Sequence, residues 1–329
     1  MIMERDEKNI FSEFEDEERK ELIAEIIRQD PSLNTLPRAQ FFALWFSDIR
    51  TLRNFAKFLE KDDPHFSWRS GILGDIHAND VPGIVAGGKQ VNKSSDTMKK
   101  KCLERDNDRC ILTKRDQPGL QCAHIVPFKL NGFSARDNTW RWLQLFWGQD
   151  LADKWIAELL CGSDQPNRLN TEQVKNLITL GSQEHNYWDN GMFAFRPVRT
   201  YQQHTKMDIA FHWLPPRGTE KQTDLIPTLS HPYPSQPQGY GRSPSGNRYL
   251  LHCETLNVLI SGHIFTVTTA NPVTHPLPSE KLLTMQWHLS RIASMQGAGE
   301  DEDSDLESDG DSVAVPSGSR SPAKEAHMF

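Results

Sequence analysis

The sequence predicts an α+β protein: a helical N-terminal region, a small mixed core with a helical insertion, and an antiparallel β extension. Two observations predict this class. Apolar residues recur every three to four positions, as in amphipathic helices, in four segments: 11–28, 38–60, 139–161 and 280–295. Short segments of β character lie between the last two helices, at 208–214, 247–260 and 263–269.

The N-terminal region is predicted to contain two helices that pack through their apolar faces. The first, over residues 11–28, should end before Pro31, because proline disrupts a helix interior. The second is expected over residues 38–60. Residues 71–96 are rich in Gly, Asp and Asn, a composition typical of a linker or long loop. We therefore expect residues 1–96 to be an acidic helical region followed by a linker.

The sequence of the central part of the chain predicts a compact unit that contains both helices and strands. A short basic helix is expected over residues 97–110, followed by a strand at 110–113, a turn at 114–119 and a second strand at 120–128. Two strands around a tight turn indicate a hairpin. The segment from Ser182 begins like a helix, with that serine available as its cap. The helical insertion at 139–161 is rich in tryptophan, and the dense helical spacing favours core packing over base stacking.

The C-terminal part predicts a Pro- and Gly-rich loop at 215–247, a last helix at 280–295 and an acidic tail at 299–329. The tail has no apolar periodicity and is expected to be disordered.

Charge is distributed unevenly along the chain. The two ends, residues 1–30 and 299–329, contain 20 of the 44 acids and only 7 of the 37 bases. Residues 31–298 therefore hold 24 acids and 30 bases, although the whole chain has a formal charge of −7. A basic centre between acidic ends is compatible with a polyanionic substrate.

Composition also points to a cellular location. No stretch of the sequence has the run of about 18 to 20 apolar residues that a membrane span requires. The acidic N-terminus lacks the basic and apolar regions of a secretory signal. Five cysteines at scattered positions do not indicate a disulfide framework. We expect an intracellular protein of the nucleus or cytoplasm, with no membrane partner.

Four residues form a pattern that suits phosphodiester hydrolysis. His124 lies at the expected end of a strand, and a neutral imidazole can take a proton from water near neutral pH. His185 and Asp189 are four residues apart, so on a helix they would lie on one face and could share a cation. Asn176 opens an apolar segment nine residues before His185, where its amide could brace the loop beneath the expected helix.

The motifs around these residues carry a family resemblance. C-x-L-T at Cys110–Thr113, A-H-I-x-P at Ala123–Pro127, N-L-x-x-L at Asn176–Leu180 and H-x-x-x-D-x-G-x-F at His185–Phe193 resemble the HNH endonucleases, particularly the version common in fungal proteins. The resemblance implies a ββα-metal core, placing an HNH nuclease domain with its β extension at residues 97–298, and metal-dependent cleavage of DNA.

Carried over position by position, the resemblance makes His124 the general base and Asn176 the residue that orients the site. His185 and Asp189 would be the metal ligands. Mg²⁺ or Mn²⁺ suits this pair best, with Zn²⁺ or Ni²⁺ as alternatives. DNA is the expected partner, and RNA stays open as an alternative. Candidate phosphate contacts, which a solvated basic face would explain equally well, are Lys99, Lys100, Lys101, Arg105 and Arg109.

Two departures from the family pattern leave other functions open. Ala123 stands where many HNH domains have a further metal ligand, and no C-x-x-C pair occurs for a structural zinc. One alternative is therefore a catalytically silent HNH module that binds nucleic acid or a protein. Another is an HNH fold held together by zinc at Cys110, Cys122 and His185. If Asp189 is not a ligand, Glu184 and Asp137 are the next candidates.

Overall fold

The computed structural model describes residues 9–59, 95–130, 138–160, 167–215, 220–221, 223–231 and 249–296. The chain divides into two units, Met1–Gly299 and Glu300–Phe329, and only the first of these two units contains described residues. The predicted linker as far as residue 94 and the predicted acidic tail therefore lie outside the described residues. Within the described ranges, none of the helices combines the length and apolar character needed to cross a membrane.

The N-terminal region is helical, as predicted, but its elements are shorter. A 3-10 turn at Ser12–Glu15 precedes helix α2 (Glu17–Gln29), which Asp16 caps by accepting a hydrogen bond from the Arg19 N–H. Helix α2 ends before Pro31, as expected. Strand β1 (Thr35–Pro37) follows and pairs with β6 (Leu225–Pro227), so the predicted loop at 215–247 contains a strand.

The single helix predicted at 38–60 is wrong, because the chain forms α3 (Arg38–Phe46) and α4 (Ile49–Leu59) instead. Ser47 stops α3: its hydroxyl donates to the Leu44 carbonyl, and its own carbonyl accepts a hydrogen bond from the buried Arg19 guanidinium. The Asp48 side chain then accepts from the Arg50 N–H at the start of α4. A serine followed by an aspartate thus ends one helix and begins the next.

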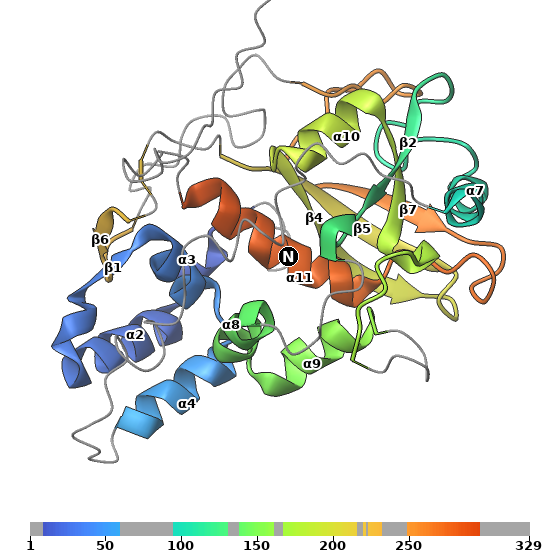
Figure 1. Ribbon diagram of the computed structural model, residues 1–329. Coiled ribbons are helices and arrows are strands. Elements are labelled where there is room, and N and C mark those ends of the chain that lie inside the picture. Colours follow the sequence, from blue (N-terminus) through green and yellow to red (C-terminus); the bar gives the residue numbers. More distant parts are fainter. Residues whose placement is uncertain are drawn as a thin grey trace, which may run out of the picture. The chain divides into compact units, whose positions relative to one another are not determined.

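The centre of the chain forms a ββα unit. Helix α7 (Asp96–Arg105) precedes strand β2 (Leu120–His124), which pairs antiparallel with β3 (Leu177–Gly181). Helix α10 (Ser182–Asp189) follows β3 directly, and Figure 1 shows it beside β2. Gly181 is the N-cap of α10 and no side chain caps it, so the expectation that Ser182 would be the cap is wrong.

The hairpin predicted at 110–128 is also wrong, because residues 110–113 form a turn and not a strand. The Cys110 N–H donates to the Arg115 carbonyl, and the Lys114 N–H donates back to Cys110. Lys114 has a positive φ of 61°, which reverses the chain locally. These local bonds satisfy the backbone of the turn, and β2 pairs with β3 across more than 50 residues of sequence.

The tryptophan-rich insertion forms two helices, α8 (Asn138–Trp147) and α9 (Gln149–Ala157), and not the single helix predicted at 139–161. The break falls at Gly148, whose φ of 78° is outside the helical region. Buried tryptophans line this pair of helices, which agrees with the expected core role; they are Trp140, Trp142, Trp147 and Trp155.

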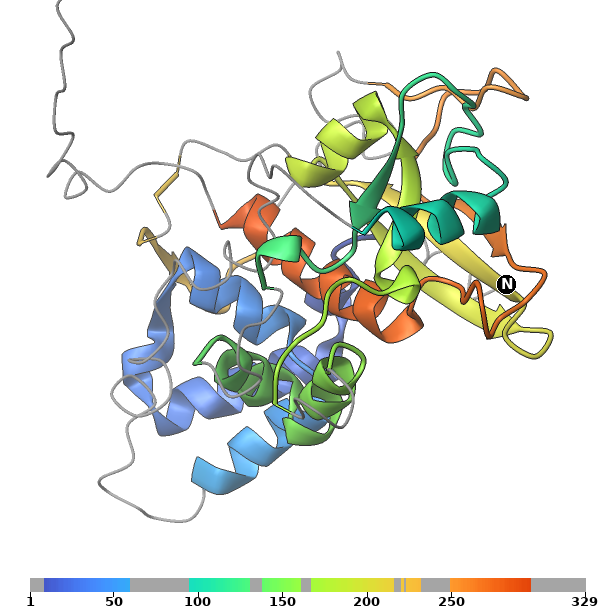
Figure 2. The ribbon, with the colours of Figure 1, turned by 45° about the vertical axis from the view of Figure 1, so that its right-hand side comes forward.

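The β extension is a three-stranded antiparallel sheet in the order β4 (Phe193–Tyr201), β5 (Lys206–Trp213) and β7 (His263–Thr268). Of the segment predicted as β at 247–260, the described part contributes only an isolated bridge between Leu251 and Val258. Helix α11 (Glu280–Met295) matches the predicted last helix and begins at the capping side chain of Ser279. It packs against β4, α3 and α9, as Figures 1 and 2 show.

Candidate active site

His124 stands at the C-terminal end of β2, and its side chain is only 4% exposed. Its ring lies against Phe128, with the ring centroids 5.7 Å apart. Burial lowers the pKa of this imidazole; the hydrogen bond and charge of Glu172 oppose the shift, while His185 and Lys99 add to it. The net result is a lowered pKa, so His124 is neutral at neutral pH and can accept a proton.

Glu172, which sequence reasoning did not select, is the partner of His124. Its Oε1 lies 2.6 Å from Nε2 of His124, and its Oε2 accepts a hydrogen bond of 2.8 Å from the Ser95 N–H. The His124 Nδ1 atom is buried and has no hydrogen-bond partner among the described residues. The only sequence signal for Glu172 is an acidic residue four positions before Asn176, which is too common to select it.

Asn176 is fully buried and connects the segments on either side of the site. Its Oδ1 accepts from the Val126 N–H at 2.9 Å, while its Nδ2 donates to the carbonyls of Val126 and Thr171 at 3.0 and 2.9 Å. The side chain thus holds the residue two positions after His124 and the residue directly before Glu172. The amide thus braces the segment after β2 and the segment before Glu172, and it fixes the two segments that carry the His124–Glu172 pair.

His185 and Asp189 lie on one face of α10, one turn apart. Nε2 of His185 is 3.5 Å from Oδ2 of Asp189, and Nδ1 of His185 is 2.6 Å from Oε1 of Gln121 on β2. Burial lowers the pKa of the imidazole and raises the pKa of the Asp189 carboxyl, each opposed by the charge of the other group. A second contact joins the same elements, because the Trp188 indole N–H donates to the His124 carbonyl at 3.2 Å.

This pair fits a divalent cation. An amide oxygen only accepts hydrogen bonds, so Nδ1 of His185 must carry the hydrogen and Nε2 presents its lone pair. That lone pair faces a carboxylate oxygen 3.5 Å away, an unfavourable pairing unless a positive charge lies between the two atoms. An imidazole nitrogen and a carboxylate oxygen together suit a transition metal or Mg²⁺. No group of three metal-binding side chains forms among the described residues, so this part of the chain would supply the two ligands His185 and Asp189.

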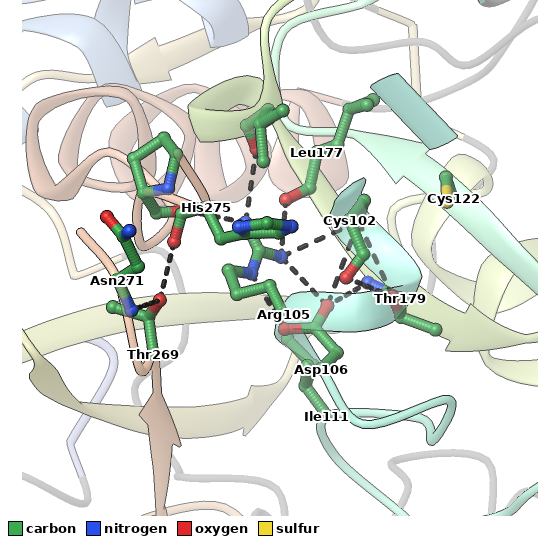
Figure 3. A network of polar contacts seen from close by, with 12 residues as sticks. Cys102, Arg105, Asp106, Ile111, Cys122, Leu177, Thr179, Thr269, Asn271 and His275 are labelled. Carbon is green, nitrogen blue, oxygen red and sulfur yellow. Dashed lines mark hydrogen bonds and ion pairs between the residues drawn. The ribbon is translucent and has the colours of Figure 1, made fainter. Parts of the chain in front are cut away.

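Arg105 is not a phosphate contact, contrary to the expectation from sequence. Its side chain is fully buried beside that of Asp106, with Nε 2.8 Å from Oδ1 of the carboxylate. The guanidinium also donates to three backbone carbonyls, those of Val174, Leu177 and Pro276, as Figure 3 illustrates. Asp106 in turn accepts from the Thr179 N–H of β3. Arg105 therefore anchors α7 to β3 and cannot reach a nucleic acid.

The remaining basic candidates lie nearer the surface. Lys100 is highly exposed and lies 3.8 Å from Glu104, while Arg109 is half exposed and forms an ion pair with Glu254. Lys99 and Lys101 are partly buried, and the charge of Lys99 reaches His124. Lys99 is therefore the basic residue of α7 that lies in electrostatic range of the candidate base.

The structure does not support the zinc alternative. Cys110, Cys122 and His185 all lie in described residues and do not form a metal-binding cluster. The Cys110 sulfur accepts from the Thr113 N–H, and the Cys122 thiol donates to the Lys99 carbonyl. Of the two reserve ligands, Asp137 lies outside the described residues. Glu184 is fully buried and accepts a hydrogen bond from the Thr113 hydroxyl, so it is not available beside His185.

The geometry of this ββα unit agrees with a comparison of the sequence with known families. Residues 110–196 match the model of the HNH endonuclease family, and this range includes His124, Asn176, His185 and Asp189. The chain therefore contains a domain of the HNH endonuclease family, within an α+β fold. No curated protein and no solved structure matches the chain.

Proposed function

We propose that this domain is a metal-dependent endonuclease that hydrolyses phosphodiester bonds of DNA. The observation that carries the proposal is that two functional groups lie where β2 and α10 are in contact. One is a neutral, buried His124, and the other is the His185–Asp189 pair with its two acceptor atoms 3.5 Å apart. The family match supports the reaction class.

In the proposed reaction, His124 takes a proton from the attacking water. Asn176 keeps the loop after His124 in place, and Gln121 keeps Nε2 of His185 directed toward Asp189. A divalent cation bound by His185 and Asp189 would stabilise negative charge on the phosphate and on the departing oxygen. Lys99, Lys100, Lys101 and Arg109 would bind backbone phosphates of the nucleic acid.

One observation favours the alternative of a silent module that binds nucleic acid or protein. Ala123 is fully buried on β2 directly before His124, so this position supplies no ligand. The alternative predicts binding without cleavage, which separates it from the main proposal.

The test is nicking of supercoiled plasmid DNA in Mg²⁺, Mn²⁺ or EDTA, with His124→Ala as the variant. Loss of a general base costs about 10²- to 10⁴-fold in rate, so we expect the variant to lose nearly all activity and to retain its metal affinity. Cleavage by His124→Ala at the wild-type rate would remove His124 from the reaction. Plasmid binding without nicking in any metal would support the silent module, and parallel assays on RNA would separate the two substrate classes.

A further inference from the structure

The inference concerns which nitrogen of His124 reacts, and it rests on the proposed function. Nε2 lies 2.6 Å from a Glu172 carboxylate oxygen. An ionised carboxylate only accepts hydrogen bonds, so the ring carries its hydrogen on Nε2. The lone pair is then on Nδ1, the buried atom that has no hydrogen-bond partner among the described residues. A buried polar atom of this kind requires a partner, and a nucleophilic water would supply one.

Glu172 is itself held on both sides. Its second oxygen accepts from the Ser95 N–H at the start of α7, and its own N–H donates to Oδ1 of Asn170 at 2.9 Å. The preceding residue, Thr171, is bound through its carbonyl to Asn176. A carboxylate fixed at both oxygens and along its backbone restricts the imidazole to one orientation.

We propose that Glu172 is a positioning residue of the nuclease, which holds His124 as the Nε2–H tautomer and stabilises the imidazolium formed during the reaction. The O–H bond of water breaks and its proton goes to Nδ1. The hydroxide oxygen forms a bond to phosphorus, and the bond from phosphorus to the departing oxygen breaks. That oxygen leaves with the electron pair and takes a proton from solvent, and Nδ1 later returns its proton to solvent.

Electrostatics agree with this assignment. Among the described residues, the ionisable groups with the largest effect on the pKa of His124 are Glu172, His185 and Lys99, and of these three Glu172 favours the protonated ring. Its negative charge therefore offsets burial and the charge of Lys99 when the imidazolium forms. The arrangement follows the logic of a base oriented by a carboxylate.

The experiment compares Glu172→Gln and Glu172→Ala with wild type in plasmid nicking at saturating Mn²⁺. We expect kcat to fall roughly 10- to 100-fold, as for other residues that orient functional histidines. The acid limb of the kcat/KM profile should move to lower pH, because Glu172 raises the pKa of His124. Added formate should partly restore Glu172→Ala. Glu158→Gln is the matched control, since Glu158 forms ion pairs with Lys175 and Lys281, whereas the groups with the largest effect on the pKa of His124 are Glu172, His185 and Lys99.

The outcomes separate this inference from the proposed function. Wild-type rates and an unmoved acid limb in both Glu172 variants would overturn the positioning role while leaving the nuclease proposal intact. A faster Glu172→Ala enzyme would also overturn it, because Glu172 would then block the base. If the wild-type protein does not cut, the proposed function fails. The ¹⁵N shifts of the His124 ring still test the tautomer, and a Nδ1–H form in wild type would refute the assignment.

Discussion

Gln121 on β2 and His185 on α10 are joined by a 2.6 Å contact between the amide Oε1 and the ring Nδ1. This contact sets the tautomer of His185 and directs its other nitrogen toward Asp189. Because Gln121 is exposed, the contact contributes little to the core. Its effect is confined to the orientation of a candidate ligand.

Replacing Gln121 by Leu should therefore weaken Mn²⁺ binding about 10- to 100-fold, the usual cost of losing a partner that orients a metal-binding histidine. The melting temperature without metal should stay close to that of wild type. Isothermal titration with Mn²⁺ measures the affinity, and Asp189→Asn is the positive control because it removes the charge of a proposed ligand. Unchanged affinity in Gln121→Leu together with a loss in Asp189→Asn would show that the contact is dispensable.

Asn176→Ala should lower the free energy of unfolding by about 3 kcal/mol. The variant loses three hydrogen bonds, each worth about 1 kcal/mol, and leaves the buried Val126 N–H without its acceptor. Urea unfolding followed by tryptophan fluorescence measures this change. Nicking under conditions where the variant stays folded should also fall, since both the His124 and Glu172 segments depend on this amide. A fully active, fully stable variant would contradict the bracing role.

Replacing Arg105 by alanine should lower the stability of the protein, whereas replacing Arg109 should change DNA binding and leave stability nearly unchanged. Arg105→Ala leaves the Asp106 charge buried without its partner, a loss that typically costs about 3 to 5 kcal/mol of stability. Arg109→Ala should leave stability nearly unchanged, because exposed ion pairs contribute little. If Arg109 contacts a phosphate, its loss should reduce the slope of log binding constant against log salt by about 1. Denaturant titrations and DNA binding at several salt concentrations measure the two effects.

His212 should make the protein less stable in acid. It is fully buried, both ring nitrogens lack hydrogen-bond partners among the described residues, and burial together with Arg196 and Arg291 lowers its pKa to about 3. Below the ordinary pKa of 6.5, His212 binds a proton in the unfolded chain but stays neutral in the folded chain. Stability is therefore lost as pH falls from about 6.5 toward 3, by several kcal/mol in total.

His212→Phe should remove much of that loss and leave stability near pH 8 within about 1.5 kcal/mol of wild type. The measurement is the free energy of unfolding against pH. A residual slope is expected from His288, whose pKa burial also lowers to about 3. An identical pH dependence in His212→Phe and wild type would show that His212 is not the group responsible.

The structural features that can be predicted from the sequence are those that depend on residues close together in the chain. Helix α11 was predicted from its apolar periodicity alone, and the cap that Ser279 supplies in the structure lies directly before the same segment. The breaks at Ser47 and Gly148 could also have been read from the sequence, since a Ser-Asp pair and a glycine commonly interrupt helices. The expected strand at 110–113 was wrong because apolar composition alone does not distinguish a buried turn from a strand.

Contacts between residues far apart in the chain could not be predicted from a single sequence. Arg105 looks like its basic neighbours on α7, and only the packing of that helix on β3 reveals that its side chain is buried. Glu172 lies 48 residues from His124, and the pairing of β2 with β3 brings the two segments together. His124, His185 and Asp189 could be selected because a family pattern preserves their order, whereas nothing in that pattern marks Glu172.

The ion pair between Glu13 and Arg291 spans 278 residues of sequence, and it has a consequence for how the protein is made. Arg291 also covers the ring of Phe46, with its guanidinium carbon 4.0 Å from the ring centroid. On a translating ribosome, the N-terminal helices emerge long before the segment that completes their packing. Their apolar faces stay accessible until α11 is released, which is when a nascent chain most needs a chaperone. A chain truncated before Glu280 would thus be an aggregation-prone product, although the segment that matches the HNH family had been translated in full.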